Sequence, residues 1–301
     1  MMGRLWKLLG PGILMAAAAV GASHLVISPS AGAAFGYQLL WLVPVACALR
    51  YHAFEFGPRF AIATGTSLLE GYGRVPGPRH WALILFLVGT VLQGVGVVSA
   101  VVGIAGAVLY AGLGVGSLPL WGSAVATVIL LLLFFGRYRV MDVLNKVMML
   151  VLALATLLAF AASPPPLSAF RHLVMPQIPA GSIVLVAALI GWMPAGIDVS
   201  VWHSLWALRD RKRWSKDGDT VSLSARRDSL RHALADMRVG YGLTVVLGIM
   251  FLMLGARVLH PEGLMPRGAD VAVTLSRVYT HILGDWMYPV FLVAAFFAMF
   301  S

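Results

Sequence analysis

The 301-residue chain is 60% hydrophobic and only 11% charged, with a mean hydropathy of +0.88. Soluble domains carry about 25% charged residues, so this balance excludes an ordinary soluble protein and predicts an all-α, polytopic transmembrane helical bundle in a lipid bilayer. The net charge of +10 does not indicate nucleic-acid binding, because the basic residues concentrate in short loops, where they indicate membrane topology. The single cysteine, Cys47, cannot form an internal disulfide.

Eight apolar segments are candidates to cross a hydrocarbon core of about 30 Å. They cover residues 10–28, 37–63, 81–109, 118–135, 140–162, 183–208, 233–259 and 286–301. We interpret them as one transmembrane domain, residues 1–301. The eighth segment stops while it is still apolar, so we expect an N-terminal fragment of a longer protein.

The charged residues between these segments predict an orientation. The start of the chain and the second, fourth and sixth connections are basic, whereas the first and third carry no charge. Basic loops stay in the cytoplasm, so we expect a cytoplasmic N-terminus. We expect the protein to be integral to a bacterial inner membrane. Residues 209–232 are then a basic cytoplasmic loop and residues 260–285 an external loop.

The sixth apolar segment is interrupted. Two glycines and a proline lie between Gly191 and Gly196, and both residue types weaken or break helices. Broken backbone at membrane depth is tolerated where it is buried in protein or lines a cavity, so the interruption predicts a binding site. Asp198 follows directly. A carboxylate in mid-membrane costs roughly 2.5 to 3.5 kcal/mol on insertion scales, which favours a functional role.

The first apolar segment has a similar weak point. Gly21 and Ser23 lower helix persistence, and His24 places an ionisable ring within an apolar run. Interruptions in the first and sixth spans are what an inverted repeat of five plus five spans predicts, with the substrate held between the two broken helices near the midplane.

Four short motifs, in this order along the chain, resemble those of the Nramp divalent-metal transporters. They are Gly10-Pro11-Gly12-Ile13-Leu14, Ala63-Thr64-Gly65-Thr66-Ser67-Leu68-Leu69-Glu70, Gly136-Arg137-Tyr138-Arg139 and Met193-Pro194. The resemblance implies an inverted-repeat transporter fold, truncated here in the eighth span. It also implies alternating access to a central metal site.

The chain departs from this family at the implied metal site. The family has Asp-Pro-Gly-Asn in the first span, where this chain has Gly21-Ala22-Ser23-His24, and Met-Pro-His in the sixth, where it has Met193-Pro194-Ala195. The resemblance also implies a backbone-carbonyl ligand at Ile190. The third span has no acidic residue, although the family's proton path uses acids there. The chain therefore lacks several residues that the resemblance implies for proton-coupled manganese or iron transport.

A replacement site can be built from the residues that remain. We predict His24, Met193 and Asp198 as metal ligands, with Gly21, Ser23 and Ile190 completing the substrate site. A mixed set of nitrogen, sulfur and oxygen donors suits a borderline transition metal better than magnesium. Without Met193, a carboxylate and carbonyls would suit a harder ion. The divalent metal is then the substrate, no cofactor is expected, and a proton is a candidate coupling ion.

Each of these residues also has a structural interpretation. His24 could hydrogen-bond a neighbouring helix, and Met193 could be a packing residue. Glu55 has His52 and Arg59 on its own helix face, which predicts a local ion pair, with a gate as the alternative. His203 lies about 140° around the helix from Asp198, so a separate proton or structural role is expected.

Other functional classes remain as alternatives. No His-Glu-x-x-His or Gly-x-Ser-x-Gly motif is present, so we do not expect an enzyme. A transporter of the same fold could carry a small organic solute or a harder cation such as magnesium, without proton coupling. A non-transporting sensor is a further alternative.

Overall fold

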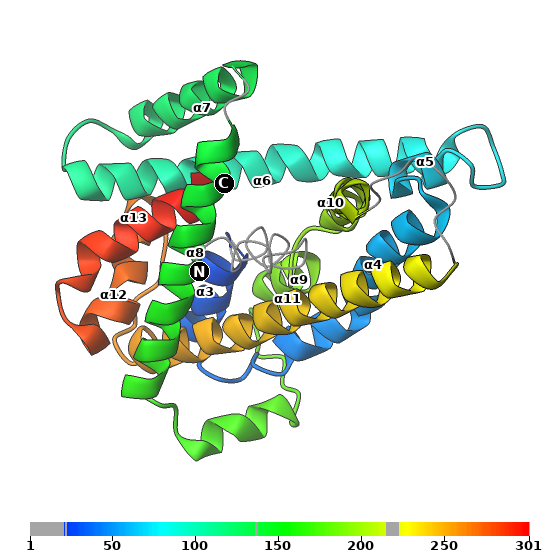
Figure 1. Ribbon diagram of the computed structural model, residues 1–301. Helices are drawn as coiled ribbons and strands as arrows, with labels where there is room; N and C mark the ends of the chain where they lie inside the picture. The colour runs from blue at the N-terminus through cyan, green and yellow to red at the C-terminus, as the bar shows by residue number, and fades with distance from the viewer. Residues whose placement is uncertain (1–20, 22, 136–137, 215–222, 301) are drawn as a thin grey trace. The chain divides into compact units, whose positions relative to one another are not determined.

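The computed structural model describes residues 21, 23–135, 138–214 and 223–300, and these residues form helices and connecting segments without strands. The predicted all-α fold class is confirmed. The elements (Figure 1) are η1 (Ser23–Ile27), α3 (Ser28–Phe35), α4 (Leu42–Thr64), α5 (Leu68–Tyr72), α6 (Trp81–Leu113), α7 (Leu118–Phe135), α8 (Tyr138–Ala162), η2 (Leu167–Leu173), α9 (Ile183–Trp192), α10 (Val199–Trp214), α11 (Leu223–Val258), η3 (Gly268–Asp270), α12 (Val271–Leu283) and α13 (Met287–Phe300).

The described chain divides into two compact units. Unit 1 contains residues 48–96 and 195–244, and unit 2 contains the described residues of 19–47, 97–194 and 245–301. Three long helices, α4, α6 and α11, contribute residues to both units. The division between Pro194 and Ala195 falls within the interruption that separates α9 from α10.

In unit 2, α3 approaches the second half of α11 closely enough for backbones to touch. A Cβ atom on Gly32 would overlap the carbonyl of Leu252 and the amide of Ala256, and one on Gly255 would overlap Pro29. Small residues allow such close crossings of membrane helices. This crossing fixes η1 and α3 beside α11.

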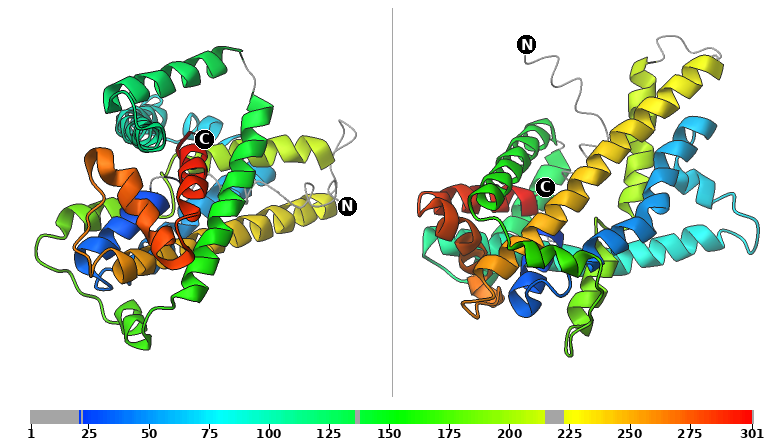
Figure 2. Two further views of the ribbon diagram at one scale, coloured as in Figure 1. Left: turned by 90° about the vertical axis from the view of Figure 1, so that its left-hand side faces the viewer. Right: turned by 90° about the horizontal axis from the view of Figure 1, so that it is seen from below.

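A second cluster of helices in unit 2 forms around α8. The amphipathic α12 and the apolar α13 both pack on it (Figure 1 and Figure 2). Thr156 and Tyr279 share a buried hydrogen bond of 2.9 Å between α8 and α12, and the Tyr279 ring lies 5.2 Å from that of Phe291 on α13. Satisfying the buried phenol in this way avoids an unpaired polar group in the core.

In unit 1, hydroxyl groups on α10 position it against α4 and α5. The Ser200 hydroxyl donates to the carbonyl of Ala53 at 2.6 Å, and the amide of Leu68 donates to Ser204 Oγ at 3.1 Å. A Cβ on Gly57 would overlap the carbonyl of Ser200. The sequence after the interruption therefore folds back onto α4 through specific polar contacts.

The helices begin and end at different residues from the apolar segments. Residues 10–20 and 22 of the first predicted span lie outside the described residues, but helical structure continues beyond residue 28, to Phe35. The left-handed backbone of Gly36, with φ of 58°, ends it. In the second predicted span, residues 37–41 form turns and the helix α4 starts at Leu42. Hydropathy locates the apolar run but not the helix ends.

Two predicted loops contain helical segments. Residues 209–214 continue α10 and residues 223–232 begin α11, so the described residues of the predicted 209–232 loop are helical. Within residues 260–285, α12 buries one face with Leu275, Val278 and Tyr279. The opposite face of α12 is polar, so the average hydropathy of this segment is too low to predict a transmembrane span.

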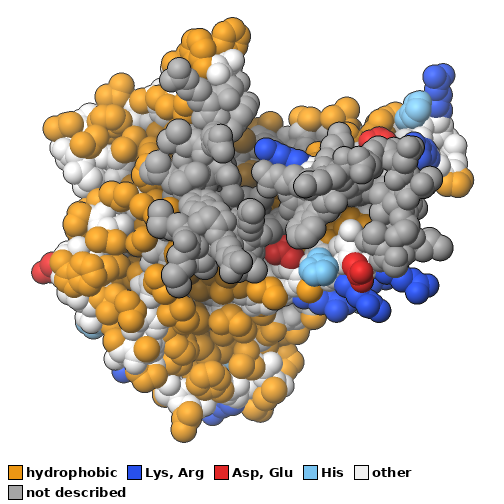
Figure 3. Space-filling model, in the orientation of Figure 1, with side chains coloured by type: hydrophobic (Ala, Val, Ile, Leu, Met, Phe, Trp, Pro, Cys, Tyr) orange, Lys and Arg blue, Asp and Glu red, His pale blue; other side chains and the backbone are white. Residues whose placement is uncertain are grey.

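Much of the apolar surface is exposed. Leu85, Leu87 and Leu92 on α6 are 65%, 60% and 71% exposed. Hydrophobic side chains cover much of the described surface on the face in Figure 3. Two helical stretches, Trp81–Leu113 and Arg227–Val258, are each long and apolar enough to cross a membrane. Exposed apolar faces of this extent match a lipid surrounding rather than water.

Candidate functional site

The two predicted interruptions meet within unit 2. His24 lies in the π-helical turn η1, and Met193 directly follows the last residue of α9; both side chains are fully buried. The helix ends here because Pro194 has no amide hydrogen to donate. Two residues that are 169 positions apart in the sequence are thereby placed in one interior region.

Ser23 connects the two interruptions. Its Oγ lies 2.9 Å from His24 Nδ1 and donates to the carbonyl of Pro194 at 3.4 Å. A hydroxyl has one proton, so Ser23 can donate either to His24 Nδ1 or to the carbonyl of Pro194. When it donates to Pro194, Oγ can accept from Nδ1–H, and His24 Nε2 carries the lone pair with which an imidazole binds a metal.

The donor atoms of His24 and Met193 converge beside α11. His24 Nε2 and Met193 Sδ each lie 3.5 Å from the point where a Cβ on Gly248 would stand. The Phe251 ring, one turn further along α11, meets the His24 ring edge-on with centroids 6.4 Å apart. The arrangement places a nitrogen and a sulfur atom beside the same residue of α11, close to an aromatic ring.

Gly21 and Ile190 were predicted to complete the substrate site. The carbonyl of Gly21 accepts hydrogen bonds from the amides of Leu25 at 2.9 Å and His24 at 3.2 Å, so it starts the helical turn. Ile190 lies in the last turn of α9 with its residue surface 45% exposed. The roles predicted for these two residues concern their carbonyl groups only.

Asp198 belongs to unit 1 and is only 8% exposed. Its Oδ1 accepts a hydrogen bond of 2.5 Å from Gln93 Nε2 on α6. Its backbone carbonyl accepts from Val201 and Trp202, so the residue stands at the start of α10. A carboxylate there interacts favourably with the helix dipole. Asp198 therefore has structural partners that the sequence did not reveal.

The predicted ligand set is divided between the units. His24 and Met193 lie together in unit 2, whereas Asp198 lies with Gln93 in unit 1. Among the described residues, no three His, Cys, Asp or Glu side chains are grouped so that they could hold one metal ion. Within unit 2 the candidate ligands are thus one imidazole and one thioether.

His203 lies on the buried face of α10 and is 1% exposed. Within the described residues, its Nδ1 has no hydrogen-bond partner, and its ring lies 6.3 Å from that of Trp206. An unpaired polar atom in a protein interior calls for a structural or functional explanation. The sequence indicated only that His203 was off the face of Asp198.

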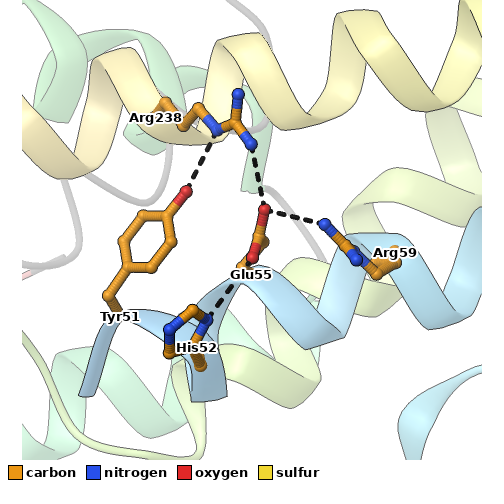
Figure 4. A network of polar contacts seen from close by, with 5 residues as sticks. All are labelled: Tyr51, His52, Glu55, Arg59 and Arg238. Carbon is orange, nitrogen blue, oxygen red and sulfur yellow. Dashed lines mark hydrogen bonds and ion pairs between the residues drawn. The ribbon is translucent and has the colours of Figure 1, made fainter. Parts of the chain in front are cut away.

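Glu55 is the centre of a polar network in unit 1 (Figure 4). Its carboxylate lies 3.0 Å from Arg59 and 3.7 Å from His52, as the helical spacing predicted, and also 3.2 Å from Arg238 on α11. Arg238 additionally donates to the Tyr51 hydroxyl at 3.0 Å. The ion pair within α4 is confirmed. The link to Arg238, 183 residues further on, is not visible in a local pattern.

Interrupted helices whose breaks meet inside a helical bundle are typical of secondary transporters. The fold is that of a solved transporter: a crystal structure of an Eremococcus coleocola manganese transporter variant matches 97% of this chain with a TM-score of 0.69 and 18% identity, covering 63% of that chain. A complex of the same transporter with an aromatic bis-isothiourea substituted compound matches with a TM-score of 0.65. These matches establish the helical transporter fold.

The family model described as natural resistance-associated macrophage protein-like, Nramp, matches residues 12–301. The chain belongs to this family and is an integral membrane protein, as its composition and motifs predicted. An uncharacterized protein of Pasteurella multocida is 32% identical over 97% of this chain and 66% of its own length. Metal transporter Nramp2 of Oryza sativa subsp. japonica is 31% identical over 62% of this chain and 36% of its own. The chain thus spans less than two thirds of each of these relatives.

Proposed function

We propose that the protein is a secondary transporter that moves a divalent metal cation by alternating access. The observation that carries this proposal is the convergence of His24 Nε2 and Met193 Sδ on one point beside Gly248. The family, the metal transporter among the relatives and the manganese transporter fold support it. The metal is the substrate, so no cofactor and no catalysed reaction are involved.

The donor atoms favour a class of ion. Imidazole nitrogen suits zinc, cobalt, nickel and copper, and thioether sulfur is a soft ligand, whereas magnesium prefers oxygen ligands. The substrate site would be completed by Ser23, which orients His24, and by backbone groups at Gly21 and Ile190. Asp198 would provide the negative charge of the pathway in unit 1, where its only described side-chain partner, Gln93, is neutral.

Alternating access would use the interruption between α9 and α10. It coincides with the division between the two units, and a short non-helical segment can absorb the dihedral changes of a hinge. The Glu55 network joins α4 to α11 by charged groups, so it would act as a gate that separates and re-forms. His203, whose Nδ1 has no hydrogen-bond partner among the described residues, would be the proton-binding group if transport is proton-coupled.

The test is uptake of manganese, cobalt, zinc and magnesium into vesicles that contain the purified protein, with and without a proton gradient. Uptake of the transition metals into these vesicles should exceed that of magnesium. In the cell, the protein would lie in a bacterial inner membrane with its N-terminus in the cytoplasm. His24→Ala and Met193→Leu should each reduce uptake at least tenfold. Met250→Leu, in a buried methionine of α11, is the matched control and should leave uptake unchanged.

Two results would overturn the proposal. If metal uptake is equal in the wild type, His24→Ala and Met193→Leu, neither residue is a metal ligand in the pathway. Absence of metal uptake by a folded protein, together with uptake of a small organic solute, would support the organic-solute alternative. Magnesium uptake without a proton requirement would instead support the harder-cation alternative.

A further inference from the structure

A cleft of about 550 Å³ opens on the surface of unit 2, between the turn after α11, the helix α12 and the first turn of α13. Its volume lies within the range of about 300 to 1,000 Å³ that is usual for small-molecule sites. None of its lining residues belongs to the candidate metal site. The polar side chains that line it include those of Glu262, Arg277, Thr280, His281, Asp285 and Tyr288.

The amphipathic character of α12 explains why this cleft is polar. One face of the helix is buried and includes Leu275 and Val278. Arg277 is followed three and four positions later by Thr280 and His281, so these three side chains share the other face. That face lines the cleft together with the start of α13, which packs beside α12 (Figure 2).

Glu262 lies between the two basic side chains of this face without forming hydrogen bonds to them. Its carboxylate oxygens are 3.7 Å from Arg277 Nη1 and 3.6 Å from His281 Nδ1. N–H···O hydrogen bonds are usually about 2.7 to 3.2 Å long. The Arg277 and His281 side chains are 55% and 62% exposed, so water screens both contacts. A carboxylate therefore fits beside Arg277, and an incoming carboxylate can replace that of Glu262.

Other polar groups of the cleft also have hydrogen-bonding capacity to spare. Within the described residues, the Asp285 carboxylate forms no ion pair, and neither it nor the Thr280 hydroxyl takes part in a side-chain hydrogen bond. The Tyr288 hydroxyl donates to the carbonyl of Ala111 at 3.2 Å, so its oxygen is left to accept. When His281 is neutral, the two carboxylates outnumber the one guanidinium, and the cleft has an excess negative charge.

This arrangement disfavours ligands with one kind of charge. A simple anion would bind Arg277 but be repelled by Glu262 and Asp285, and a simple cation would leave Arg277 unused. A metal ion is not favoured either, because the described acidic and His side chains are not grouped in threes that could hold one. A ligand with both a carboxylate and an ammonium group uses the charged groups of both signs.

We propose that this cleft binds a small zwitterion of the amino-acid class. Arg277 binds the carboxylate of the ligand, Asp285 binds its ammonium group, and the Tyr288 oxygen accepts a further hydrogen bond from that ammonium group. The proposal does not depend on the metal site. In the predicted orientation the connection 260–285 is external, so the ligand would reach the cleft from outside the cell.

Isothermal titration calorimetry of the purified protein tests the class of ligand. The probes are glycine, β-alanine and leucine, and acetate and methylamine are the controls with a single charge. At least one amino acid should bind saturably, and at least tenfold more tightly than acetate and methylamine. Absence of saturable amino-acid binding would overturn the proposal, and so would acetate or methylamine that binds as tightly as the amino acids.

Substitutions test the position of the site. Arg277→Gln and Asp285→Asn should each weaken binding of that amino acid at least tenfold, because each removes the partner of one charged group. Arg267→Gln and Asp270→Asn are the matched controls and should bind it as the wild type does, since neither residue lines the cleft. All four residues are exposed, so the variants should keep the melting temperature of the wild type. Equal affinities in all four variants would place the amino acid elsewhere and contradict the proposal.

Discussion

Each of the two units contains one pair of candidate site residues, and the two pairs differ in kind. In unit 2, His24 Nε2 and Met193 Sδ, two neutral donor atoms, both lie beside Gly248 on α11. In unit 1, the Asp198 carboxylate already accepts a hydrogen bond from Gln93 and stands at a helix N-terminus. The buried charge has a hydrogen-bond partner and a helix N-terminus that stabilise it, whereas the neutral pair brings a nitrogen and a sulfur atom to the same residue of α11.

A glycine lies beside each pair and allows a close approach. A Cβ on Gly196 would overlap both Gln93 Nε2 and Asp198 Oδ1, so this glycine lets the pair close. A Cβ on Gly248 would stand 3.1 Å from Val43 Cγ1 and 3.5 Å from His24 Nε2 and Met193 Sδ, so this glycine lets those side chains approach α11 closely. The same residue type therefore permits a hydrogen bond in unit 1 and close side-chain packing against a helix in unit 2.

The largest expected effect removes the framework of the unit 2 pair. Gly32→Val should prevent the crossing of α3 and α11, because its side chain would collide with the backbone of Leu252 and Ala256. Overpacking of this kind costs about 3 kcal/mol or more. Thermal unfolding of the purified protein should show the loss. Gly103→Val, on α6 with no atom near an added Cβ, is the control; equal melting temperatures for the two variants would contradict the prediction.

The next effect concerns the orientation of His24. Ser23→Ala removes the hydroxyl that links His24 Nδ1 to Pro194, so metal affinity should fall about 10- to 100-fold, as it does for other groups that orient ligands. Metal titration measures this change. Ser28→Ala is the matched control, because the buried Ser28 hydroxyl has no hydrogen-bond partner among the described residues. A Ser23→Ala protein with unchanged affinity would show that Nε2 is not held for a metal.

The sequence predicted what depends on local chemistry. Two glycines and a proline predicted the break after Trp192, and helical spacing predicted the contacts of Glu55 with His52 and Arg59. The family followed from short motifs in order.

What the sequence did not predict depends on contacts between distant segments. Gln93 and Asp198 are 105 residues apart, and nothing local pairs them. Gly248 has no feature that distinguishes it from Gly242 until its neighbours are known. The insertion cost of a carboxylate favoured a functional role for Asp198, but that cost does not say whether the carboxylate contacts an ion or an amide group.

A smaller effect sharpens the comparison on the unit 1 side. Gly196→Ala should displace Gln93 from Asp198 at a cost of about 1 to 2 kcal/mol in the free energy of unfolding. Metal binding by His24 and Met193 should persist, because both lie in unit 2.

Asp198→Asn keeps an oxygen that can accept from Gln93 but removes the charge, so uptake should fall while stability changes little. Wild-type uptake in Asp198→Asn would assign the carboxylate to structure alone.

The smallest expected effect concerns the Glu55 network, which belongs to neither pair. Glu55 is buried, but its partners His52, Arg59 and Arg238 are exposed to solvent, which screens the ion pairs. Ion pairs with exposed partners contribute about 0.2 to 1 kcal/mol, so Glu55→Gln should lower stability by about 1 kcal/mol, and added salt should reduce the difference. Arg59→Gln removes only a contact within α4, whereas Arg238→Gln removes the contact between α4 and α11. If the network is a gate, Arg238→Gln should change the uptake rate more than Arg59→Gln, with metal affinity unaltered in both. Equal rates in the two variants would leave the network a structural contact, since only Arg238 joins separate helices.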